Sequence, residues 1–440
     1  MNILTVLNPS RIIVFCGIFV SFSLFSQEIQ HCGTHEAIQY QETQNPGYLQ
    51  QVNEIFSRSK DHSSQDRSTV YTIPVVVHIV YNIGDENLPD SVIFNQIQVL
   101  NDSYGYMNAD SVNLRPEFDP IVGTTNIQFE LAVIGPDGNP TTGITRTQTD
   151  ITEFGGIGIL TGDMSDLERI KSTTNGGEDP WDQSRYLNIW VGDMSVFGFT
   201  ALMGYATPPS GLANWPAGST SGMDDGVVVQ YQAFGSNNPI ALDPGSGAID
   251  FRGRTCVHEV GHYLGLRHIW GDGDCTQEDG IDDTPNAMEN SQTYGCDSLP
   301  LNTCVDNIGA SGDLPNMYEN YMDYSSEHCQ IAFTLGQRDL MRGVIETERW
   351  DLIDNYPLLS TTENDDLNIS VYPNPSNGHI TITGINETST VEVYSNNSQL
   401  IQNTILVNNN IKITDLAIGI YFVKISNSKS VTTKKITVIK

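Results

Sequence analysis

Residues 258–268 combine three histidines, one glutamate and one glycine at fixed spacing. His258 and His262 are four residues apart, so on a helix of 3.6 residues per turn both imidazoles face one side and can reach one metal ion. Gly265 can take the left-handed conformation that ends a helix, and the turned chain would bring His268 round as a third nitrogen ligand. The spacing therefore predicts a zinc site with three histidine ligands.

Three protein ligands leave one tetrahedral position of zinc open, and a water there has its pKa lowered towards ~7. Glu259 follows the first histidine directly and is placed to accept the proton of that water as a general base. A helix with surface histidines is the plainer interpretation. It does not explain a glycine at the spacing that redirects the chain to a third histidine, so the pattern favours hydrolytic chemistry.

Several strands and a helix must position this motif. Residues 71–81 are rich in β-branched side chains and predict a mostly buried strand, and Asp90 can cap the amphipathic helix that follows. Further strands are expected over residues 127–133, 185–191 and 226–231. This order of elements before an active-site helix predicts an α/β subdomain.

Two expectations concern the place where a substrate would bind. The strand near Leu187 is a candidate for the sheet edge on which an extended peptide adds as a further strand. Residues 204–209, which end in two prolines, are expected to form a loop. His78, within the first strand, is expected to be a hydrogen-bonded core residue and not a metal ligand.

The charge balance limits the possible partners. The chain of 440 residues carries 53 acidic and 21 basic side chains, a formal net charge of -32 at pH 7. Nucleic acids and anionic membranes are excluded as partners, because contacts with phosphate need lysine and arginine. The length exceeds what one core normally holds, so two or three domains are expected.

Residues 1–26 have the layout of a secretory signal peptide, with Arg11 ahead of an apolar run over residues 12–25. The run is shorter than the ~20 residues of a membrane span, and no other stretch is apolar enough, so the mature form should have none. Cys16 lies in this run, in a poor context for lipidation, so we expect cleavage and not anchoring.

Six cysteines remain, and an even set in an exported protein indicates disulfides. Four of them follow the zinc motif in one loop-rich segment, where spacing alone does not fix the pairing. The six are Cys32, Cys256, Cys275, Cys296, Cys304 and Cys329.

Residues 27–68 are polar and end in a basic, serine-rich stretch, which predicts a propeptide; a disordered spacer is the alternative. Cys32 is a lone thiol here and a good zinc ligand, so it is a candidate latency switch that occupies the open zinc position. A disulfide with Cys256 competes with this interpretation. Cys256 lies two residues before His258, on another helix face, where a buried thiol is the ordinary expectation.

Residues 271–285 are rich in aspartate and glycine, which suits a cation with hard oxygen ligands such as calcium. The spacing is not that of an EF-hand loop, and a solvated acidic loop is the alternative. The candidate calcium ligands are Asp274, Asp279, Asp282, Asp283 and Thr284.

The zinc domain is expected over residues 69–358 and should close with a helix within residues 333–350. A linker over residues 359–367 would connect it to a small all-β sandwich domain over residues 368–440. Short strands are expected there at residues 380–382, 391–394, 411–413 and 421–425.

The 258–268 motif is that of the metzincin metallopeptidases, and other stretches make residues 69–350 resemble the pappalysin family. These stretches are residues 73–81, 186–191, 282–285 and 320–324, together with Cys329. The resemblance implies an α/β (α+β) catalytic domain with a mixed twisted sheet and an active-site helix.

By the same resemblance His258, His262 and His268 bind zinc, Glu259 is the base and Met322 lies in the tight turn beneath the metal. Tyr324 matches a tyrosine that supports the tetrahedral intermediate. The family also implies disulfides Cys275–Cys304 and Cys296–Cys329, calcium in the acidic loop and a latency propeptide.

Relatives that prefer a basic residue after the scissile bond carry an acid just before the cysteine that matches Cys329. His328 holds that place here and Glu327 precedes it, so the resemblance does not extend to that preference.

The last seventy or so residues resemble the sorting domain of the type IX secretion system of Bacteroidetes. The resemblance rests on Tyr-Pro-Asn-Pro at residues 372–375, Gly378, Gly-Ile-Tyr at residues 419–421 and the basic end of the chain. It implies export across both membranes of a Gram-negative bacterium, with the secretion machinery as a partner.

Together these features predict a secreted or cell-surface zinc endopeptidase that cleaves protein or peptide substrates outside the cell. Its expected cofactors are zinc and calcium. The alternative is a non-enzymatic surface adhesin that keeps metals for stability.

Overall fold

The computed structural model describes most of the chain, including the zinc motif and everything packed around it. The described residues are 30–62, 67–200, 202–209, 224–243, 248–291, 301–354, 370–374, 376–383, 388–395, 400–406, 411–417, 419–426 and 431–438. The predicted signal peptide and the predicted linker lie outside these ranges. No helix among the described residues is both long and apolar enough to cross a bilayer.

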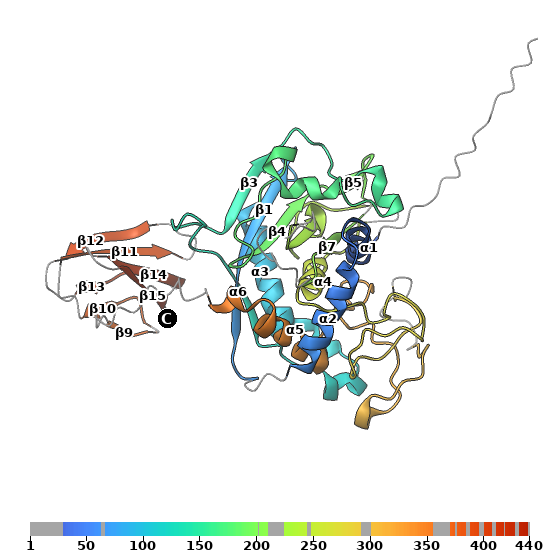
Figure 1. Cartoon of the computed structure of the whole chain (residues 1–440). Coiled ribbons are helices and arrows are strands. Elements are labelled where there is room, and N and C mark those ends of the chain that lie inside the picture. The colour runs from blue at the N-terminus through green and yellow to red at the C-terminus, as the bar shows by residue number, and fades with distance from the viewer. Residues whose placement is uncertain are drawn as a thin grey trace, which may run out of the picture.

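A six-stranded mixed sheet forms the framework of the larger unit (Figure 1). Its strands run in the order β2-β1-β4-β8-β7, and β3 also pairs with β1. All pairs are parallel except β7 with β8, so β7 is an antiparallel edge strand. The bounds are β1 Tyr71–Tyr81, β2 Ile127–Leu131, β3 Ile144–Gln148, β4 Leu187–Gly192, β7 Gly204–Ala206 and β8 Val227–Gln230. A short hairpin, β5 Ser195–Val196 with β6 Phe199–Thr200, precedes β7.

Helices flank this sheet, and one of them carries the zinc motif. They are α3 Asp90–Tyr104, α4 Arg254–Tyr263, α5 Leu335–Thr347 and α6 Trp350–Asp354. The short 3-10 helices are η1 Ala109–Asn113, η2 Pro116–Ile121, η3 Ile157–Thr161, η4 Leu167–Lys171, η5 Thr173–Asn175, η6 Tyr231–Ala233 and η7 Gly309–Ser311. A capping box at Thr334 and Gln337 starts α5, because each side chain accepts a hydrogen bond from the other residue's backbone.

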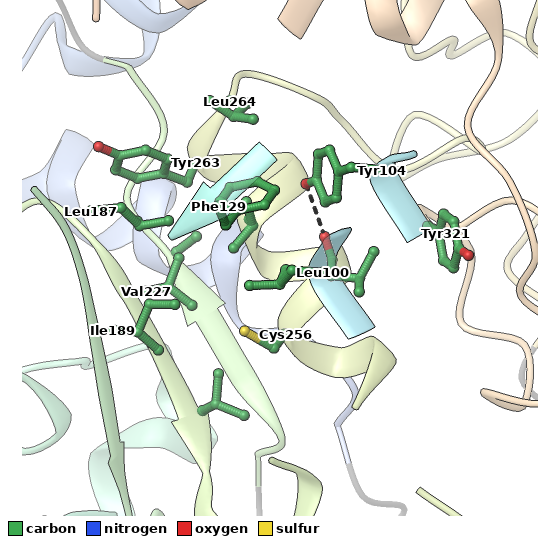
Figure 2. Packing of buried hydrophobic residues seen from close by; sticks show 14 of the residues in the cluster. Leu100, Tyr104, Phe129, Leu187, Ile189, Val227, Cys256, Tyr263, Leu264 and Tyr321 are labelled. Atoms are coloured by element: carbon green, nitrogen blue, oxygen red, sulfur yellow. Dashed lines mark hydrogen bonds between the residues drawn. The ribbon is translucent and has the colours of Figure 1, made fainter. Parts of the chain in front are cut away.

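The core between sheet and helices fixes the position of α4. Figure 2 shows Leu187, Ile189 and Val227 of the sheet pointing towards the helix that carries Cys256. Tyr104 of α3 is fully buried, and its hydroxyl donates a hydrogen bond to the carbonyl of Val257 at 3.2 Å. The zinc-motif helix is therefore held on one side by apolar packing and on the other by α3.

The segment predicted to be a propeptide is ordered and contains two helices, α1 Thr34–Gln44 and α2 Tyr48–Asp61, so the alternative of a disordered spacer is wrong for residues 30–62. Helix α2 lies along α5, where the absence of a side chain at Gly343 lets the Ser59 carbonyl approach closely. Charged contacts also hold the end of α2: Arg58 with Glu348 at 2.5 Å and His62 with Glu346 at 2.8 Å at the end of α5, and Lys60 with Asp282 of the acidic loop at 2.6 Å.

Three local predictions are wrong. Leu187 lies on β4, which pairs on both sides with β1 and β8, so it is not at a sheet edge. The edge is β7, inside the segment expected to be a loop. Asp90 is the first residue of α3 and makes no capping hydrogen bond, because its carboxylate binds Arg146 instead.

The C-terminal part is all-β, as predicted. One sheet has the order β13-β10-β9 and the other β12-β11-β14-β15. The bounds are β9 Ser370–Tyr372, β10 Ile380–Thr383, β11 Ser389–Ser395, β12 Leu400–Leu406, β13 Ile411–Ile413, β14 Gly419–Ser426 and β15 Val431–Val438. Alternating side chains such as Val391, Val393, Val423 and Ile425 form its own apolar core.

Candidate metal centre

The three motif histidines converge as their spacing predicts. His258 and His262 lie on α4, and Gly265 follows the helix with a φ of +92°, the left-handed conformation that turns the chain. The Nε2 atom of His262 lies 3.0 Å from that of His258 and 3.0 Å from that of His268. All three side chains are buried.

The second nitrogen of each ring is held by an acceptor, and this fixes the tautomers. His258 Nδ1 donates to the Tyr321 carbonyl at 2.7 Å, and His262 Nδ1 donates to the Leu266 carbonyl at 2.8 Å. His268 Nδ1 lies 2.5 Å from Oδ1 of Asp272. With the proton on Nδ1, each Nε2 presents a lone pair.

Three lone pairs gathered at this distance repel one another unless a cation lies between them. Burial keeps the pKa of His258 well below its ordinary value and lowers that of His262 to about 3, so these two rings do not provide the charge by protonation. Neutral imidazoles with fixed tautomers are the donor set that zinc prefers. The residues present therefore fit a zinc ion.

Cys32 completes a four-residue cluster. Its Sγ and one nitrogen from each of the three histidines lie within 4.8 Å of one another, all buried. Both Cys32 and Cys256 are free thiols, so the alternative of a disulfide between them is wrong. Cys256 is instead the buried core thiol that its place on α4 indicates.

Glu259 is buried beside the cluster, and propeptide groups occupy its carboxylate. Its Oε2 accepts hydrogen bonds from Cys32 Sγ at 3.3 Å and from Thr34 Oγ1 at 3.1 Å. Burial raises the pKa of Glu259 to about 8, although these two hydrogen bonds act in the opposite direction. A Cβ at Gly204 would lie 2.9 Å from Oε1, so the edge strand needs glycine at this point.

Met322 and Tyr324 pack against the helix and the histidines. A Cβ on Gly261 would come within 2.5 Å of Met322 Sδ, which places the methionine directly against α4. The ring of Tyr324 makes an edge contact with His268, with centroids 4.9 Å apart. Its hydroxyl donates to the Cys32 carbonyl at 3.2 Å, and burial raises its pKa well above the ordinary value, so it stays a donor.

The segment around Cys32 runs along the edge strand. Gly33 N donates to the Gly204 carbonyl at 2.9 Å, and Met203 N donates to the Gln30 carbonyl at 3.0 Å. The bridge between Gln30 and Leu202 is parallel. The chain from Leu202 to Gly204, where β7 begins, thus binds the backbone of the propeptide through hydrogen bonds in the manner of β-augmentation.

Comparison with known proteins identifies the family of this site. The family profile described as Pregnancy-associated plasma protein-A, a group of M43 peptidases, matches residues 172–346. A promirolysin variant from Tannerella forsythia shares 36% identity, covering 75% of this chain and 98% of that one, with a TM-score of 0.59. The chain belongs to the pappalysin family of metallopeptidases. A structure of mature mirolysin in complex with a cleaved peptide is 37% identical, with a TM-score of 0.54 over 67% of this pappalysin and 98% of that chain.

Curated relatives agree with this assignment. An extracellular metalloprotease of Arthroderma otae is 27% identical over 298 residues, which are 66% of this chain and 84% of that protein. One from Colletotrichum graminicola is 36% identical over 141 residues, or 31% of this chain, and the match spans 45% of its own length. The adhesin alternative receives no support from these relatives.

Residues 370–440 match the profile of the secretion system C-terminal sorting domain. This match and the extracellular relatives make the pappalysin a secreted or cell-surface protein.

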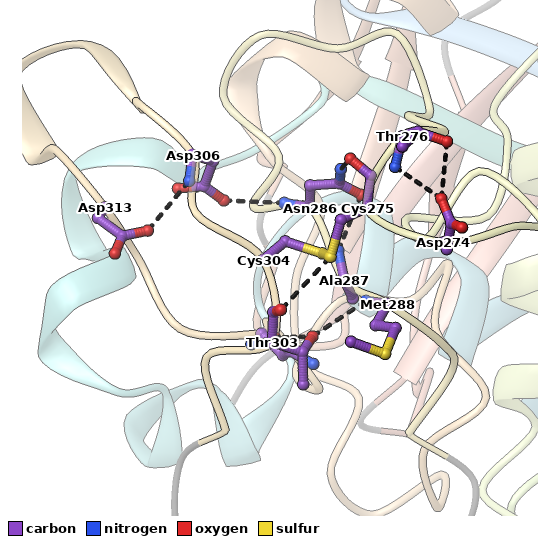
Figure 3. Close-up of a disulfide and its surroundings, with 11 residues drawn as sticks. Asp274, Cys275, Thr276, Asn286, Ala287, Met288, Thr303, Cys304, Asp306 and Asp313 are labelled. Atoms are coloured by element: carbon purple, nitrogen blue, oxygen red, sulfur yellow. Dashed lines mark hydrogen bonds between the residues drawn. A yellow bond between two sulfur atoms is a disulfide. The ribbon is translucent and has the colours of Figure 1, made fainter.

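One predicted disulfide is present and the other is only partly described. Figure 3 shows the Cys275–Cys304 bridge, which joins two loop segments beside Asn286 and Thr303. Cys329 is also disulfide-bonded. Its expected partner Cys296 lies outside the described residues, so that pairing stays a prediction.

The structure separates the five candidate calcium ligands into two groups. Asp279, Asp283 and Thr284 lie together: Thr284 hydrogen-bonds Asp279, and the charge of Asp283 helps to raise the Asp279 pKa, which burial brings to about 8. Asp274 accepts hydrogen bonds from Thr276, and Asp282 is 90% exposed and pairs with Lys60. Among the five candidates, only the first group is brought together by the fold.

Several residues around the centre escaped the sequence interpretation. Asp272 binds both His268 and, through Oδ2 at 3.3 Å, His35 of α1. Thr34 reaches Glu259 across 225 positions of sequence. Trp270 stacks on His268 with centroids 4.5 Å apart.

Glu327 is buried and accepts hydrogen bonds from the first backbone amides of α4, among them Thr255 N at 2.7 Å. The partners of Thr34 and Glu327 are distant in sequence, so no local pattern indicates those contacts, whereas Asp272 and Trp270 follow His268 by four and two residues.

Proposed function

We propose that this pappalysin is a zinc-dependent endopeptidase that is synthesised as an inactive precursor. The observation that carries the proposal is the convergence of Cys32, His258, His262 and His268 within 4.8 Å, beside the buried carboxylate of Glu259. Three of these donors belong to the catalytic unit and one belongs to the segment that would be removed. The same centre therefore accounts for activity and for latency.

His258, His262 and His268 would hold zinc through Nε2. Zinc, when bound, supplies Lewis-acid polarisation of a carbonyl and lowers the pKa of a coordinated water. Glu259 takes a proton from the attacking water and delivers it to the leaving amine.

Tyr324 donates a hydrogen bond to the oxygen that develops negative charge. In the precursor its hydroxyl donates a hydrogen bond to the Cys32 carbonyl, which would take the place of a substrate carbonyl. Residues 203–206 of the edge strand would bind the substrate backbone with the groups that now bind residues 30–34. The likeness to mirolysin, whose mature form is known in complex with a cleaved peptide, supports this assignment.

Latency results from three simultaneous contacts. Cys32 Sγ, as a thiolate, would hold the open position of the metal, Thr34 binds the general base, and the Cys32 carbonyl binds Tyr324. Helix α2 keeps this segment in place through its ion pairs with α5 and the acidic loop. Cleavage within the propeptide, expected over residues 27–68, would release all three contacts together.

Calcium is proposed at Asp279, Asp283 and Thr284. One carboxylate oxygen on each aspartate, Asp279 Oδ2 and Asp283 Oδ1, is buried and finds no hydrogen-bond partner within the described part of the chain. Buried oxygens of this kind are costly without a cation, and they are the ligands calcium prefers.

The function is tested with casein and with a quenched fluorescent peptide library, using enzyme matured from the full chain. Cleavage that stops with a zinc chelator and returns with added zinc is the expected result. Binding of zinc without any cleavage, over all peptides of the library, would refute the proposal.

A further inference from the structure

Two aromatic side chains lie on the surface next to the peptide-binding edge strand. Phe197 is 73% exposed and Phe199 is 75% exposed, on the hairpin formed by β5 and β6 (Figure 1). Large aromatic side chains usually bury most of their area, because leaving it in water is unfavourable. An exposed pair therefore needs an explanation.

The turn between these strands holds an aromatic residue in an unfavourable backbone conformation. Phe197 and Gly198 both have positive φ, 53° and 77°, the conformation of a two-residue hairpin turn that normally takes asparagine, aspartate or glycine. A bulky residue is unfavourable in this conformation. Glu153 holds it there, since its two oxygens accept hydrogen bonds from Phe197 N and Gly198 N, each at 2.8 Å.

The hairpin leads directly into the strand that binds extended chains. Phe199 lies three residues before Leu202, and three residues span at most about 11 Å. Leu202 forms a bridge with Gln30, two residues from the thiol that reaches the metal ligands. In a chain bound in this register, the residue beside the aromatic pair is about five residues along the chain from the residue at the metal centre.

We propose that Phe197 and Phe199 form a remote subsite that binds an aromatic or large apolar side chain of an extended polypeptide substrate, about five residues from the cleaved bond. The subsite continues the interface that β7 makes with residues 30–34. It rests on the proposed peptidase function, because the bound chain is the substrate.

A lipid surface fits this hairpin less well than a polypeptide. The carboxylate of Glu153 lies directly beneath the turn, and the whole chain has a net charge of -32, both of which disfavour anionic headgroups. A peptide brings its own backbone hydrogen bonds to β7, which a lipid cannot do.

The test measures selectivity in peptides that are long enough to reach the hairpin. Two series of peptides carry phenylalanine or serine about five residues before or about five residues after the bond that is cleaved. Matured enzyme should prefer phenylalanine to serine roughly tenfold in kcat/KM in one series, the gain expected for burying part of one aromatic ring. The double variant Phe197→Asn and Phe199→Thr, whose new residues suit the turn and the strand, should reduce the ratio to about one.

The matched control is Val112→Ser, which removes another apolar side chain that is 85% exposed, in η1. It should keep the roughly tenfold ratio. A ratio near one in both series with unsubstituted enzyme, an unchanged ratio in the double variant, or binding to phosphatidylcholine vesicles that the double variant loses would each overturn the subsite.

Binding separates this inference from the proposed function. Fluorescence anisotropy of the same peptides on a Glu259→Gln enzyme, matured in trans, should show the same preference without cleavage. If no peptide is cleaved by unsubstituted enzyme but the affinity ratio depends on Phe197 and Phe199, the peptidase proposal fails and the subsite stands.

Discussion

Replacing Cys32 with alanine removes the propeptide side chain that completes the four-residue cluster. The change also removes the 3.3 Å hydrogen bond from Sγ to Glu259. It leaves Thr34 on Glu259, Gly33 on the edge strand and the ion pairs of α2 in place. The propeptide should therefore stay folded against the enzyme while it no longer closes the metal centre.

The magnitude follows from the number of ligands. Four protein ligands bind structural zinc with about 10–16 kcal/mol, so one ligand in four contributes about 2.5–4 kcal/mol. At about 1.4 kcal/mol per factor of ten, the equilibrium between closed and open propeptide shifts by about 10² to 10³. We expect the intact Cys32→Ala precursor to hydrolyse a short fluorogenic peptide faster than the unsubstituted precursor by this factor, with the matured rate as its upper limit.

The assay uses initial rates, with mass spectrometry to establish that the chain is still full-length when the rate is taken. Cys256→Ala is the matched control, because it removes a second free buried thiol of the described residues and should leave the precursor latent. The reasoning is refuted if the Cys32→Ala precursor is as inactive as the unsubstituted one, or if Cys256→Ala activates it equally.

Three further predictions concern the surroundings of the centre. Asp272→Asn should weaken zinc affinity about 10–100-fold by titration against a chelator, since the carboxylate orients His268; unchanged affinity would exclude that role. Calcium should raise Tm more at pH 8 than at pH 5. Burial raises the pKa of Asp279 in the folded protein to about 8. Without calcium, the stability of the folded protein therefore falls as pH rises from the ordinary pKa of aspartate towards 8, and a bound cation offsets this loss. An equal gain at both pH values would contradict the site. Replacing Cys275 and Cys304 with alanine should lower the unfolding free energy by about 3–4 kcal/mol, because the bridge closes a loop of 29 residues. A loss under about 1 kcal/mol in urea unfolding would contradict this.

The zinc motif could be predicted from sequence because its geometry is local. His258, His262 and Gly265 lie within one helix and its end, where residue spacing alone determines direction. The first strand, over residues 71–81, was predictable for a similar reason, because a long β-branched run suits a buried parallel strand.

The edge strand and the propeptide contacts could not be predicted from the sequence. Residues 204–206 form a strand because β8 offers them a partner, and a three-residue segment ahead of two prolines carries no periodic signal. Thr34 acts on Glu259, which only the fold brings near it. Asp272 follows His268 by four residues, but its second partner, His35 of α1, is likewise brought near by the fold. Helix α2 did carry a signal, since Tyr48, Val52, Ile55 and Phe56 recur at helical spacing.

The most direct test of the central claim is Glu259→Gln, which keeps the shape of the side chain and removes its ability to accept a proton. The variant, matured in trans, should bind one zinc per chain in elemental analysis and lose at least about 10²-fold in kcat on the fluorogenic peptide. Retained activity with zinc bound would contradict the role of Glu259 as general base. Loss of zinc together with activity would show that the carboxylate serves the metal site and not the proton transfer.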